Sequence, residues 1–327
     1  MHMRIFLLFP LILTLSVSCA HWPNFRASVS VRVHDELGQP LEGAQVQLGF
    51  TRNYDATNVV IRQGMSDKNG VFSASAVTSG YIGIRVTHPE FYDWRDRATF
   101  YVNPDERVIA PYDPSETPIV AELRRRLNPI PLYARRIVIP FPVEAEEVGF
   151  DLEKADWVAP HGRGLHPDFV FLFRRYLKGG RAFDASWELR FSNPGDGIQL
   201  YEATHPMGRG SALRMPNHAP LTGYEDTLDH QVGQDPDNRT YGFVNPTSSL
   251  DNYFFRVRTI IDEEGEVMTA HYGKIHGPIR VHGALAETSG IGFTYYFNPS
   301  PSDTNLELDP ARNLFTDLSV NEMVRDP

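Results

Sequence analysis

A turn and the strand that follows it are encoded by Asp35-Glu36-Leu37-Gly38-Gln39-Pro40-Leu41-Glu42-Gly43-Ala44-Gln45-Val46-Gln47-Leu48. Gly38 and Pro40 favour a turn, because glycine tolerates positive φ and proline restricts its own φ. Val46 and Leu48 then alternate with polar neighbours, which is the two-residue period of a half-buried strand. This part of the chain is therefore predicted to enter a β-sheet.

The segments on either side extend the same pattern. Before the turn, Val29, Val31 and Val33 share one face of a predicted strand over Ala27–Val33. After it, Ser66-Asp67-Lys68-Asn69-Gly70-Val71-Phe72 predicts a tight hairpin turn with Gly70 at positive φ, and the next strand begins at Val71. Further strands are predicted at Tyr81–Thr87, Ala98–Val102 and Ile119–Arg125. These bring the total to about the seven strands of a β-sandwich.

Residues 35–48 and 66–72 together resemble the carboxypeptidase regulatory-like family, whose module is a transthyretin-like β-sandwich of about one hundred residues. The resemblance implies that residues 24–126 form a seven-stranded transthyretin/Ig-like sandwich. In the carboxypeptidases that name the family, this module accompanies a zinc-dependent catalytic domain. The present chain contains no His-Glu-x-x-His motif and no alternating strand and helix pattern, so the resemblance extends to the fold and not to peptidase activity.

A second β-rich, sandwich-like domain with long loops is predicted over residues 134–327, after a proline-containing linker at 127–133. The chain is thus expected to be all-β. Within the second domain, 156–160, 191–199 and 252–259 resemble the C-terminal part of an uncharacterised family of secreted, lipoprotein-type bacterial proteins, for which no activity is assigned. The predicted strands are Arg136–Ile139, Phe169–Tyr176, Ala185–Phe191, Tyr253–Ile261, Val267–Lys274 and Ile291–Phe297.

The N-terminus has the features of an export signal over residues 1–19. Arg4 precedes the short apolar run Ile5–Leu15, and Cys19, the single cysteine of the chain, follows small residues. Ser16-Val17-Ser18-Cys19 resembles the lipobox of bacterial lipoproteins, with Ser16 where that family usually has leucine, which implies lipidation of Cys19. Ordinary cleavage after Ala20 is the alternative. We therefore expect an exported protein that is lipid-anchored to the bacterial outer membrane, or otherwise periplasmic or secreted.

Composition narrows the range of partners. The formal net charge is −10, and the longest basic run, at 124–126, is short enough to be the solvated end of a strand. Nucleic acid is therefore not an expected partner, because phosphate binding needs clustered Lys and Arg. No segment after Cys19 approaches the roughly 20 apolar residues of a membrane span, so membrane attachment is expected only through an N-terminal lipid.

The long polar stretch at 202–252 contains the candidate metal and catalytic residues. Its acidic side chains could supply the oxygen ligands that calcium prefers, although their spacing is not that of an EF-hand and a solvated acidic loop is the simpler interpretation. The candidate calcium ligands are Asp226, Asp229, Asp235 and Asp237. No other cofactor is expected.

Three histidines share this stretch: His205, His218 and His230. Imidazole can bind a ligand, coordinate zinc or transfer protons, but none of these residues has metal-ligand spacing. If they converged in a pocket with acidic neighbours, the chain would be a secreted hydrolase with its site in the 202–252 loop. If they lie apart, they are ordinary histidines.

Aromatic residues favour carbohydrate binding instead of hydrolysis. Trp94, in a predicted loop, and Trp157 could stack on sugar rings, whereas Trp187 alternates with Leu189 and is predicted to be part of the core. Core packing is the alternative for the other two as well. Because the chain has no recognisable catalytic motif, the sequence favours a cell-envelope or secreted binding or structural module whose partner is a glycan or an envelope protein.

Overall fold

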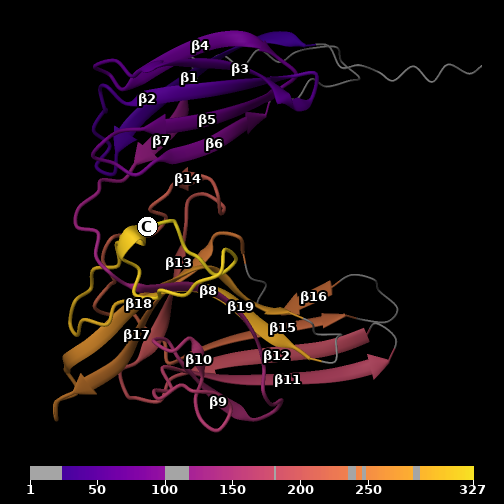
Figure 1. Cartoon of the computed structure of the whole chain (residues 1–327), viewed down its shortest axis with the longest axis vertical. Helices are drawn as coiled ribbons and strands as arrows, with labels where there is room; N and C mark the ends of the chain where they lie inside the picture. Colours follow the sequence, from indigo (N-terminus) through magenta and orange to yellow (C-terminus); the bar gives the residue numbers. More distant parts are fainter. Residues whose placement is uncertain (1–23, 100–117, 180–181, 235–240, 245–247, 283–287) are drawn as a thin grey trace, which may run out of the picture.

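The computed structural model describes residues 24–99, 118–179, 182–234, 241–244, 248–282 and 288–327. Within these residues all regular structure is β-strand, apart from one 3₁₀ turn at Pro310–Arg312, so the all-β prediction is confirmed. No helix in the described ranges has the length and apolar character needed to cross a membrane. Figure 1 shows two β-sandwiches, one above the other.

The N-terminal sandwich has seven strands of its own in the described residues, as predicted. Its smaller sheet has the order β4-β1-β7 and its larger sheet the order β6-β5-β2-β3. Val29, Val31 and Val33 on β1 are fully buried against the inner face of β2, which presents Val46, Leu48 and Phe50. The strands are β1 (Phe25–Asp35), β2 (Gln45–Arg52), β3 (Asp55–Met65), β4 (Val71–Thr78), β5 (Tyr81–Thr87), β6 (Trp94–Thr99) and β7 (Ile119–Leu123).

The two predicted turns of this sandwich are held by aspartate side chains. Asp35 Oδ1 accepts hydrogen bonds from the backbone N–H groups of Leu37 and Gln39, and Asp67 Oδ1 accepts from Asn69 and Val71. Gly70 has φ +73°, and a Cβ atom there would lie 2.2 Å from the Val33 carbonyl oxygen. Only glycine fits at this position.

The C-terminal sandwich consists of a six-stranded and a five-stranded sheet. Their orders are β10-β9-β11-β12-β15-β16 and β13-β17-β18-β19-β8. Aromatic side chains fill the space between them, among them Phe150, Phe171 and Trp187 from one sheet and Phe255 and Tyr295 from the other. The strands are β8 (Tyr133–Pro140), β9 (Glu147–Asp151), β10 (Asp156–Trp157), β11 (Phe169–Gly179), β12 (Ala182–Arg190), β13 (Gly197–Glu202), β15 (Thr227–Gln234), β16 (Tyr241–Val244), β17 (Asp251–Ile261), β18 (Val267–His282) and β19 (Gly290–Phe297).

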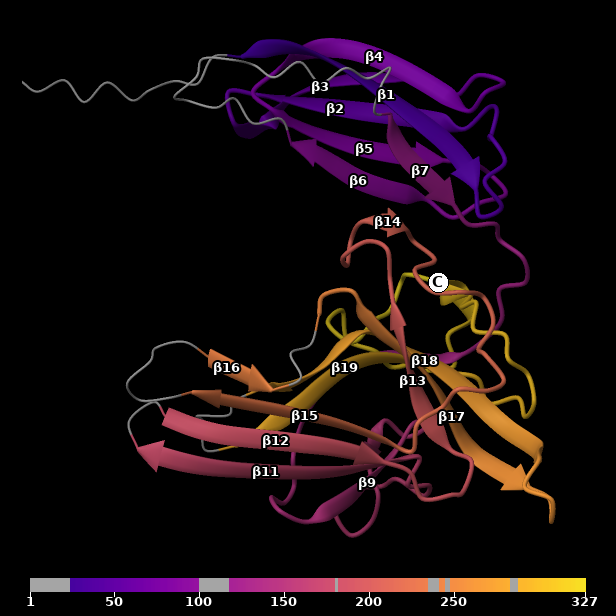
Figure 2. The ribbon, with the colours of Figure 1, turned by 180° about the vertical axis from the view of Figure 1, so that it is seen from behind.

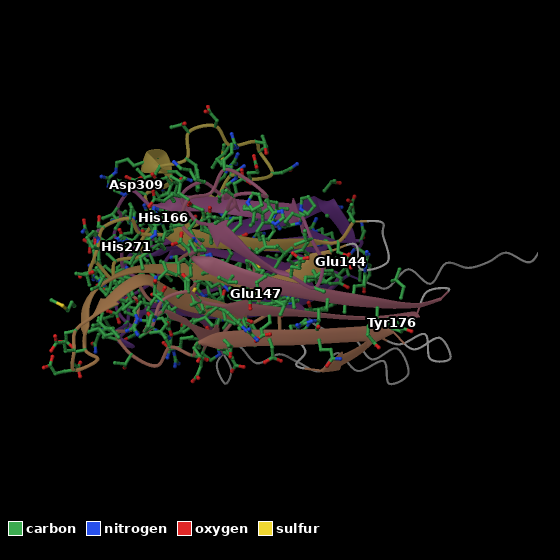
Figure 3. All side chains as sticks on the ribbon, turned by 90° about the horizontal axis from the view of Figure 1, so that it is seen from below. Glu144, Glu147, His166, Tyr176, His271 and Asp309 are labelled. Atoms are coloured by element: carbon green, nitrogen blue, oxygen red, sulfur yellow. The ribbon has the colours of Figure 1, made fainter. Side chains whose placement is uncertain are left out.

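The two ends of the six-stranded sheet differ. Figure 3 shows Tyr176 of β11 toward one end of the molecule, while His166, in the loop before β11, lies toward the other end, near His271 of β18. Along the sheet, Arg175 pairs with Glu144 at 2.7 Å and Arg190 pairs with Glu147 at 3.0 Å. The Arg190–Glu147 pair is about half-exposed on both sides and contributes little to stability, whereas the Arg175 side chain is mostly buried.

The five-stranded sheet is buried on both faces. Its inner face meets the six-stranded sheet, and its outer face is covered by residues 203–225 and 298–327. Phe254, Tyr272 and Tyr296 point to this outer side, where they pack against Met215, Leu306, Leu308 and Val324. The outer layer lies between the sheet and the N-terminal sandwich (Figure 2).

Several strands differ from the sequence-based expectation. The strand predicted at Ala98–Val102 is β6 over Trp94–Thr99, and residues 100–102 lie outside the described ranges. The stretch at 202–252 is not a strand-poor loop, because it contains β15, β16 and the short strand β14 (Gly210–Ser211). Strands β3, β9 and β13 were also not expected. The proposed domain boundaries at 126 and 134 stay predictions.

Candidate binding site between the two sandwiches

Residues 203–216 connect the two sandwiches. This segment leaves the outer layer of the five-stranded sheet and places β14 beside β6, where Gly210 pairs with Arg95 and Ser211 with Trp94 in antiparallel register. The backbone N–H of Ala212 also donates to the Asp93 carbonyl at 2.7 Å. Figures 1 and 2 both show β14 between the two sandwiches. The larger N-terminal sheet therefore ends in a strand supplied by the C-terminal part of the chain.

A second connection is made by Glu307, whose side chain is fully buried. Its carboxylate accepts hydrogen bonds from the Tyr92 hydroxyl at 2.7 Å and from the backbone N–H groups of Leu127 at 3.0 Å and Asn128 at 2.8 Å. Burial, reinforced by the adjacent carboxylate, raises the pKa of Tyr92. Glu307 thus joins the N-terminal sandwich, the segment that follows it and the C-terminal outer layer.

A cleft of about 830 Å³ lies between these two connections, and we refer to it as the inter-sandwich cleft. Its walls come from both sandwiches, from the β14 segment and from the last described residues. The residues that line it are Tyr92, Asp93, Arg95, Arg126, Pro129, Met207, Gly208, Arg209, Gly210, Ser211, Ala212, Arg214, His276, Leu308, Asp309, Pro310, Arg325, Asp326 and Pro327. This volume is in the range of small-ligand sites.

A small cavity of about 20 Å³ adjoins the cleft. The two share Arg209, Gly210, Ser211 and Arg214, and Trp94 and His205 close the far side of the small cavity. Trp94 Nε1 and Ser211 Oγ are both buried without a hydrogen-bond partner in the protein. The cavity is large enough for one water molecule to bond with these two atoms.

His276 forms part of the cleft floor. It is 6% exposed, and its Nδ1 lies 2.9 Å from the Tyr296 hydroxyl, while its Nε2 has no hydrogen-bond partner in the protein. Burial lowers the pKa of His276, and the positive charges of Lys274 and Arg214 lower it further. The imidazole is therefore neutral at physiological pH. A register shift in β18 after His276, with Gly277 at φ +76°, is typical of a bulge that redirects a side chain.

Lys274 lies behind the cleft rather than in its wall. Its Nζ is 3.2 Å from the Pro327 carbonyl oxygen and 4.6 Å from the centre of the Tyr296 ring. The Tyr296 hydroxyl in turn lies 3.2 Å from the Asp326 carbonyl oxygen. Burial lowers the pKa of Lys274 to about 7, and the charge of Glu307 opposes this shift. The last two residues therefore cover the lysine.

The aromatic residues expected to bind sugar rings are not accessible. Trp94 is fully buried as the first residue of β6, so its expected position in an exposed loop is wrong. Trp157 is 3% exposed, packs edge to face on Phe150 and Phe171, and donates from Nε1 to the Pro140 carbonyl at 2.9 Å. Neither ring offers a free face. Trp187 is 2% exposed in the core, as its alternation with Leu189 predicts.

The three histidines of the 202–252 stretch have different surroundings. His205 lies edge to face against Trp94 with ring centres 6.1 Å apart, and His218 is exposed with Nδ1 3.1 Å from Thr304 Oγ1. His230 is buried on β15 beside Trp187, with ring centres 5.8 Å apart. Only His205 borders either cavity. The hydrolase alternative required their convergence in one pocket, and the structure does not bring them together.

The candidate calcium ligands are only partly described. Asp226 and Asp229 are exposed, and Asp235 and Asp237 lie outside the described residues, as does Cys19. In the part of the chain that the structure covers, no three His, Cys, Asp or Glu side chains are placed to hold a metal ion. Calcium binding and lipidation therefore stay predictions.

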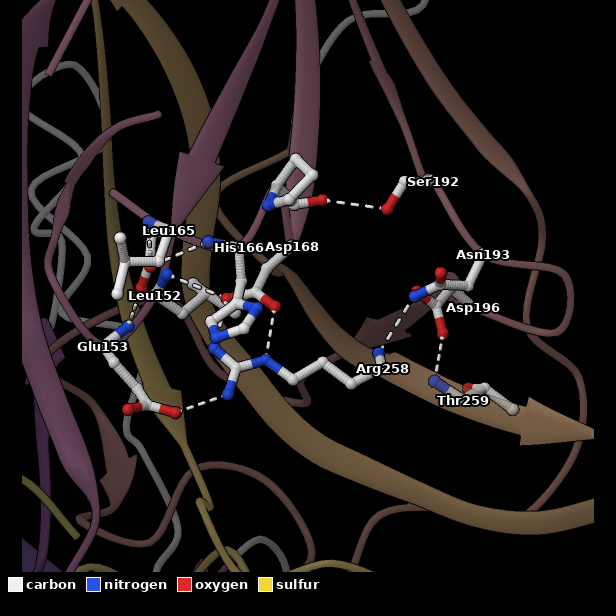
Figure 4. Close-up of polar contacts among 12 residues, drawn as sticks. Leu152, Glu153, Leu165, His166, Asp168, Ser192, Asn193, Asp196, Arg258 and Thr259 are labelled. Carbon is white, nitrogen blue, oxygen red and sulfur yellow. Dashed lines mark hydrogen bonds and ion pairs between the residues drawn. The ribbon is translucent and has the colours of Figure 1, made fainter. Parts of the chain in front are cut away.

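A second polar cluster lies at the edge of the C-terminal core and centres on Arg258 (Figure 4). Its guanidinium makes two bonds to Asp168, at 2.7 and 3.0 Å, and a third to Glu153. Asp168 also accepts from the Leu152 backbone N–H at 3.0 Å. Burial raises the pKa of Asp168, and the guanidinium offsets part of that shift.

Neighbouring carboxylates in this cluster are also engaged with the backbone. Asp196 accepts from the N–H groups of Arg258 at 3.2 Å and Thr259 at 2.8 Å, and Asp151 accepts from four backbone N–H groups of its own and the following loop. These bonds hold β17 at Arg258, where φ is +54°. The cluster has a structural role, because its acidic groups already have partners within the protein.

Sequence patterns had not indicated the residues of the inter-sandwich cleft. Arg126 belongs to the basic run that was interpreted as a solvated strand end, and Arg214 and His276 stand in no recognised motif. Their proximity depends on β14 crossing to the other sandwich, which no local pattern encodes.

No protein-family model matches the chain, and no curated protein matches it. Among solved structures, the shaft pilin SpaA of Lactobacillus rhamnosus GG is 8% identical with a TM-score of 0.24, covering 73% of this chain and 89% of the pilin. The major pilin subunit BcpA of Bacillus cereus is 9% identical with a TM-score of 0.20, covering 82% and 95%.

A third similar structure is the dioxygenase domain of a dioxygenase carbohydrate-binding protein fusion from Streptomyces sp. SirexAA-E. It is 16% identical with a TM-score of 0.22, and the alignment covers 33% of this chain and 84% of that domain. Similarities at these TM-scores carry no argument about function, which has to come from the residues of this chain.

Proposed function

We propose that this chain is an exported binding module of the bacterial cell envelope that holds a glycan in the inter-sandwich cleft. The observation that carries the proposal is the cleft itself: about 830 Å³ between two sandwiches, with unpartnered polar atoms in and beside its wall. Sites of this kind are common where two folded units meet. Tyr92 and Glu307 anchor the two walls to each other, so the cleft is preorganised.

The carboxylates that line the inter-sandwich cleft favour binding of a glycan over its hydrolysis. Glycoside hydrolysis requires two carboxyl groups on opposite sides of the scissile bond. In the cleft, Asp93 accepts from Arg85 at 2.7 Å and Asp309 accepts from Arg312 at 2.6 Å, so both carboxylates are occupied. Among the lining carboxylates, Asp326 alone makes no side-chain hydrogen bond or ion pair with the described residues, and one carboxylate does not make the required pair.

Export and anchoring belong to the same proposal. The carboxypeptidase regulatory-like resemblance of residues 24–126 and the lipobox-like sequence ending at Cys19 support a module displayed at the envelope. Replacing Cys19 with Ala should move the protein from the membrane fraction to the soluble periplasmic fraction without changing its fold, as followed by cell fractionation and circular dichroism. Continued membrane association of a folded Cys19→Ala variant would contradict lipid anchoring.

Binding is tested by screening the chain that starts after the export signal on a glycan array and measuring each retained glycan by calorimetry. The Ala212→Trp variant places a large side chain in the cleft wall and should weaken binding at least tenfold. Ser28→Trp, on the exposed face of β1, is the matched control and should bind like the wild-type chain. Equal binding by both variants would place the site elsewhere, and no binding to any glycan would refute the function.

A further inference from the structure

We infer that the inter-sandwich cleft takes an acidic sugar, with Arg214 binding the ligand carboxylate and His276 bonding to one of its hydroxyl groups. This inference rests on the proposed function and adds the chemical class of the ligand. Three observations carry it: an unpartnered buried imidazole nitrogen in the cleft lining, a fixed guanidinium with a free end, and a local charge opposite to that of the whole chain.

His276 Nε2 is an unpartnered acceptor or donor in the cleft lining. It is buried and has no hydrogen-bond partner in the protein. Trp94 Nε1 and Ser211 Oγ are also unpartnered, and one water molecule in the small cavity can bond with both. An unpartnered buried polar group costs about 1–3 kcal/mol, so His276 Nε2 indicates an external hydrogen-bonding partner.

Arg214 is held in position by its other bonds. Its Nε donates to Asn252 Oδ1 at 2.7 Å and its Nη2 donates to the Ser249 carbonyl at 3.0 Å, while no bond from Nη1 is found in the described residues. Asn252 Oδ1 also accepts from the Gly277 N–H at 3.0 Å, next to His276. The guanidinium is thus fixed beside the imidazole with donor capacity left for the cleft. A preorganised guanidinium suits a carboxylate.

The hydrogen bonds around His276 determine which of its ring nitrogens carries the proton and which can accept a hydrogen bond from a ligand. The Tyr296 hydroxyl has one proton, and the Asp326 carbonyl, 3.2 Å away, can only accept it. With that proton used, His276 Nδ1 carries the hydrogen that bonds to the tyrosine oxygen, and Nε2 is left as an acceptor. Nε2 therefore needs a donor from the ligand, such as a sugar hydroxyl. An ionised carboxylate alone cannot supply it.

Charge favours an acidic ligand. The cleft lining contains five arginines and three aspartates, and the whole chain has a formal net charge of −10. Asp93 and Asp309 are bonded to Arg85 and Arg312, and Arg209 pairs with Asp96 at 3.6 Å; these three partners lie outside the lining, and they add two positive charges and one negative charge around it. Arg325, by contrast, is exposed and makes no ion pair within the described residues. The cleft is therefore a positive region on a negative molecule and attracts an anion.

Neutral sugars fit less well than acidic ones. Neutral sugar rings are usually bound on exposed aromatic faces, whereas Tyr92, the aromatic residue in the lining, is 6% exposed and has Arg126 over its ring at 4.8 Å. A sugar that carries both a carboxylate and hydroxyl groups satisfies both the arginines and the imidazole. An acidic peptide, whose backbone N–H groups can also donate to His276 Nε2, is the competing ligand that the titration tests.

The test is calorimetric titration of the chain without its export signal. The probes are galacturonic acid di- and trisaccharides, with the corresponding neutral galactose oligosaccharides, tetraglutamate peptide and inorganic phosphate as comparisons. We expect the acidic sugars to bind at least tenfold more tightly than any comparison probe, and to weaken as salt concentration rises. Tighter binding of tetraglutamate or phosphate would overturn the inference. Binding of neutral sugars alone would also overturn it while leaving the proposed function standing.

Variants identify the residues involved. Arg214→Lys keeps the charge but loses the fixed geometry and should weaken acidic-sugar binding about tenfold or more, and Arg325→Ser, at an exposed position, should weaken it severalfold without a folding defect. Arg32→Ser, at an exposed position on β1, is the matched control and should bind normally. Unchanged binding in the folded Arg325→Ser and Arg214→Lys variants would overturn the inference.

Discussion

Glu307 shows how one residue can support a site that it does not line. The carboxylate is fully buried and its two oxygens accept three hydrogen bonds from two other segments, one at Tyr92 and one at Leu127 and Asn128. A buried carboxylate without such partners would be strongly unfavourable, so these segments are held where their N–H and O–H groups meet it. The walls of the inter-sandwich cleft are positioned by this arrangement.

Replacing Glu307 with Gln tests this arrangement. The amide keeps the shape but has one acceptor oxygen and an NH₂ group that faces N–H or O–H donors, so the free energy of unfolding should fall by about 2–4 kcal/mol. Urea denaturation would measure the change. Tyr92→Phe removes one of the three bonds and should cost about 1–2 kcal/mol. A Glu307→Gln variant as stable as the wild-type chain would show that the buried charge is dispensable.

His271 provides a pH-dependent contribution to stability. Burial, together with the charge of Arg258, lowers its pKa from 6.5 to about 4 in the folded chain. Between pH 6.5 and pH 4 the unfolded chain therefore binds a proton at this residue that the folded chain does not, and stability falls as pH falls through that window.

The size of this loss is about 2 kcal/mol, allowing for the partial exposure of the ring. Thermal melts at intervals from pH 7 to pH 4 should show a steeper loss for the wild-type chain than for His271→Gln. Carboxylates that titrate at lower pH are common to both proteins, so the difference between the two curves isolates the histidine. If the melting temperatures of the two proteins fell in parallel with pH, the result would contradict the lowered pKa of His271.

At the scale of elements, β14 depends on a glycine. Gly210 has φ +77°, and a Cβ atom there would lie 3.0 Å from the His205 ring. Gly208, two residues earlier, has a similar φ of +79° but nothing within 4 Å of the corresponding Cβ position. The two sites share the same backbone strain and differ in steric contact, so they form a matched pair.

Gly210→Ala should displace β14 from β6, whereas Gly208→Ala should cost only about 1 kcal/mol from its backbone conformation. The measurement is amide hydrogen exchange. The Ala212 N–H, which bonds to the Asp93 carbonyl, should exchange faster in Gly210→Ala than in Gly208→Ala. Equal protection of the Ala212 N–H in both variants would show that β14 tolerates a Cβ atom against the His205 ring.

The elements that sequence patterns could predict are those with a clear alternation or turn. Strand β5 has the predicted bounds Tyr81–Thr87, because alternate residues of it are buried. Strand β3 was missed, since nearly all of its side chains are exposed and no alternation shows. Trp94 was placed in a loop because charged residues surround it, yet it begins β6 with its ring buried while Arg95 lies on the exposed side of the strand. The inter-sandwich cleft could not be predicted, because residues distant in sequence build it.

At the scale of the molecule, the two largest hydrophobic cores of the described residues share no residue. One contains the buried side chains of β1, β2, β5 and β6, and the other contains the aromatic residues between the six- and five-stranded sheets. Between the two sandwiches, the described connections are mainly polar: the β14–β6 pairing with the Ala212–Asp93 bond, the Arg209–Asp96 ion pair, the Arg124–Tyr201 bond and the hydrogen bonds around Glu307. Such a limited interface couples two folded units more weakly than each core couples its own strands.

We therefore expect two unfolding transitions in calorimetry, each governed by its own core. Leu48→Ala removes a fully buried side chain from the first core and should destabilise it by about 2–5 kcal/mol, and Phe171→Ala should destabilise the second core by about 3–5 kcal/mol. Each variant should lower the midpoint of one transition and leave the other close to its wild-type value. If both variants lower a single shared transition, the two cores unfold as one unit, and the coupling through β14 and Glu307 is stronger than the number of contacts suggests.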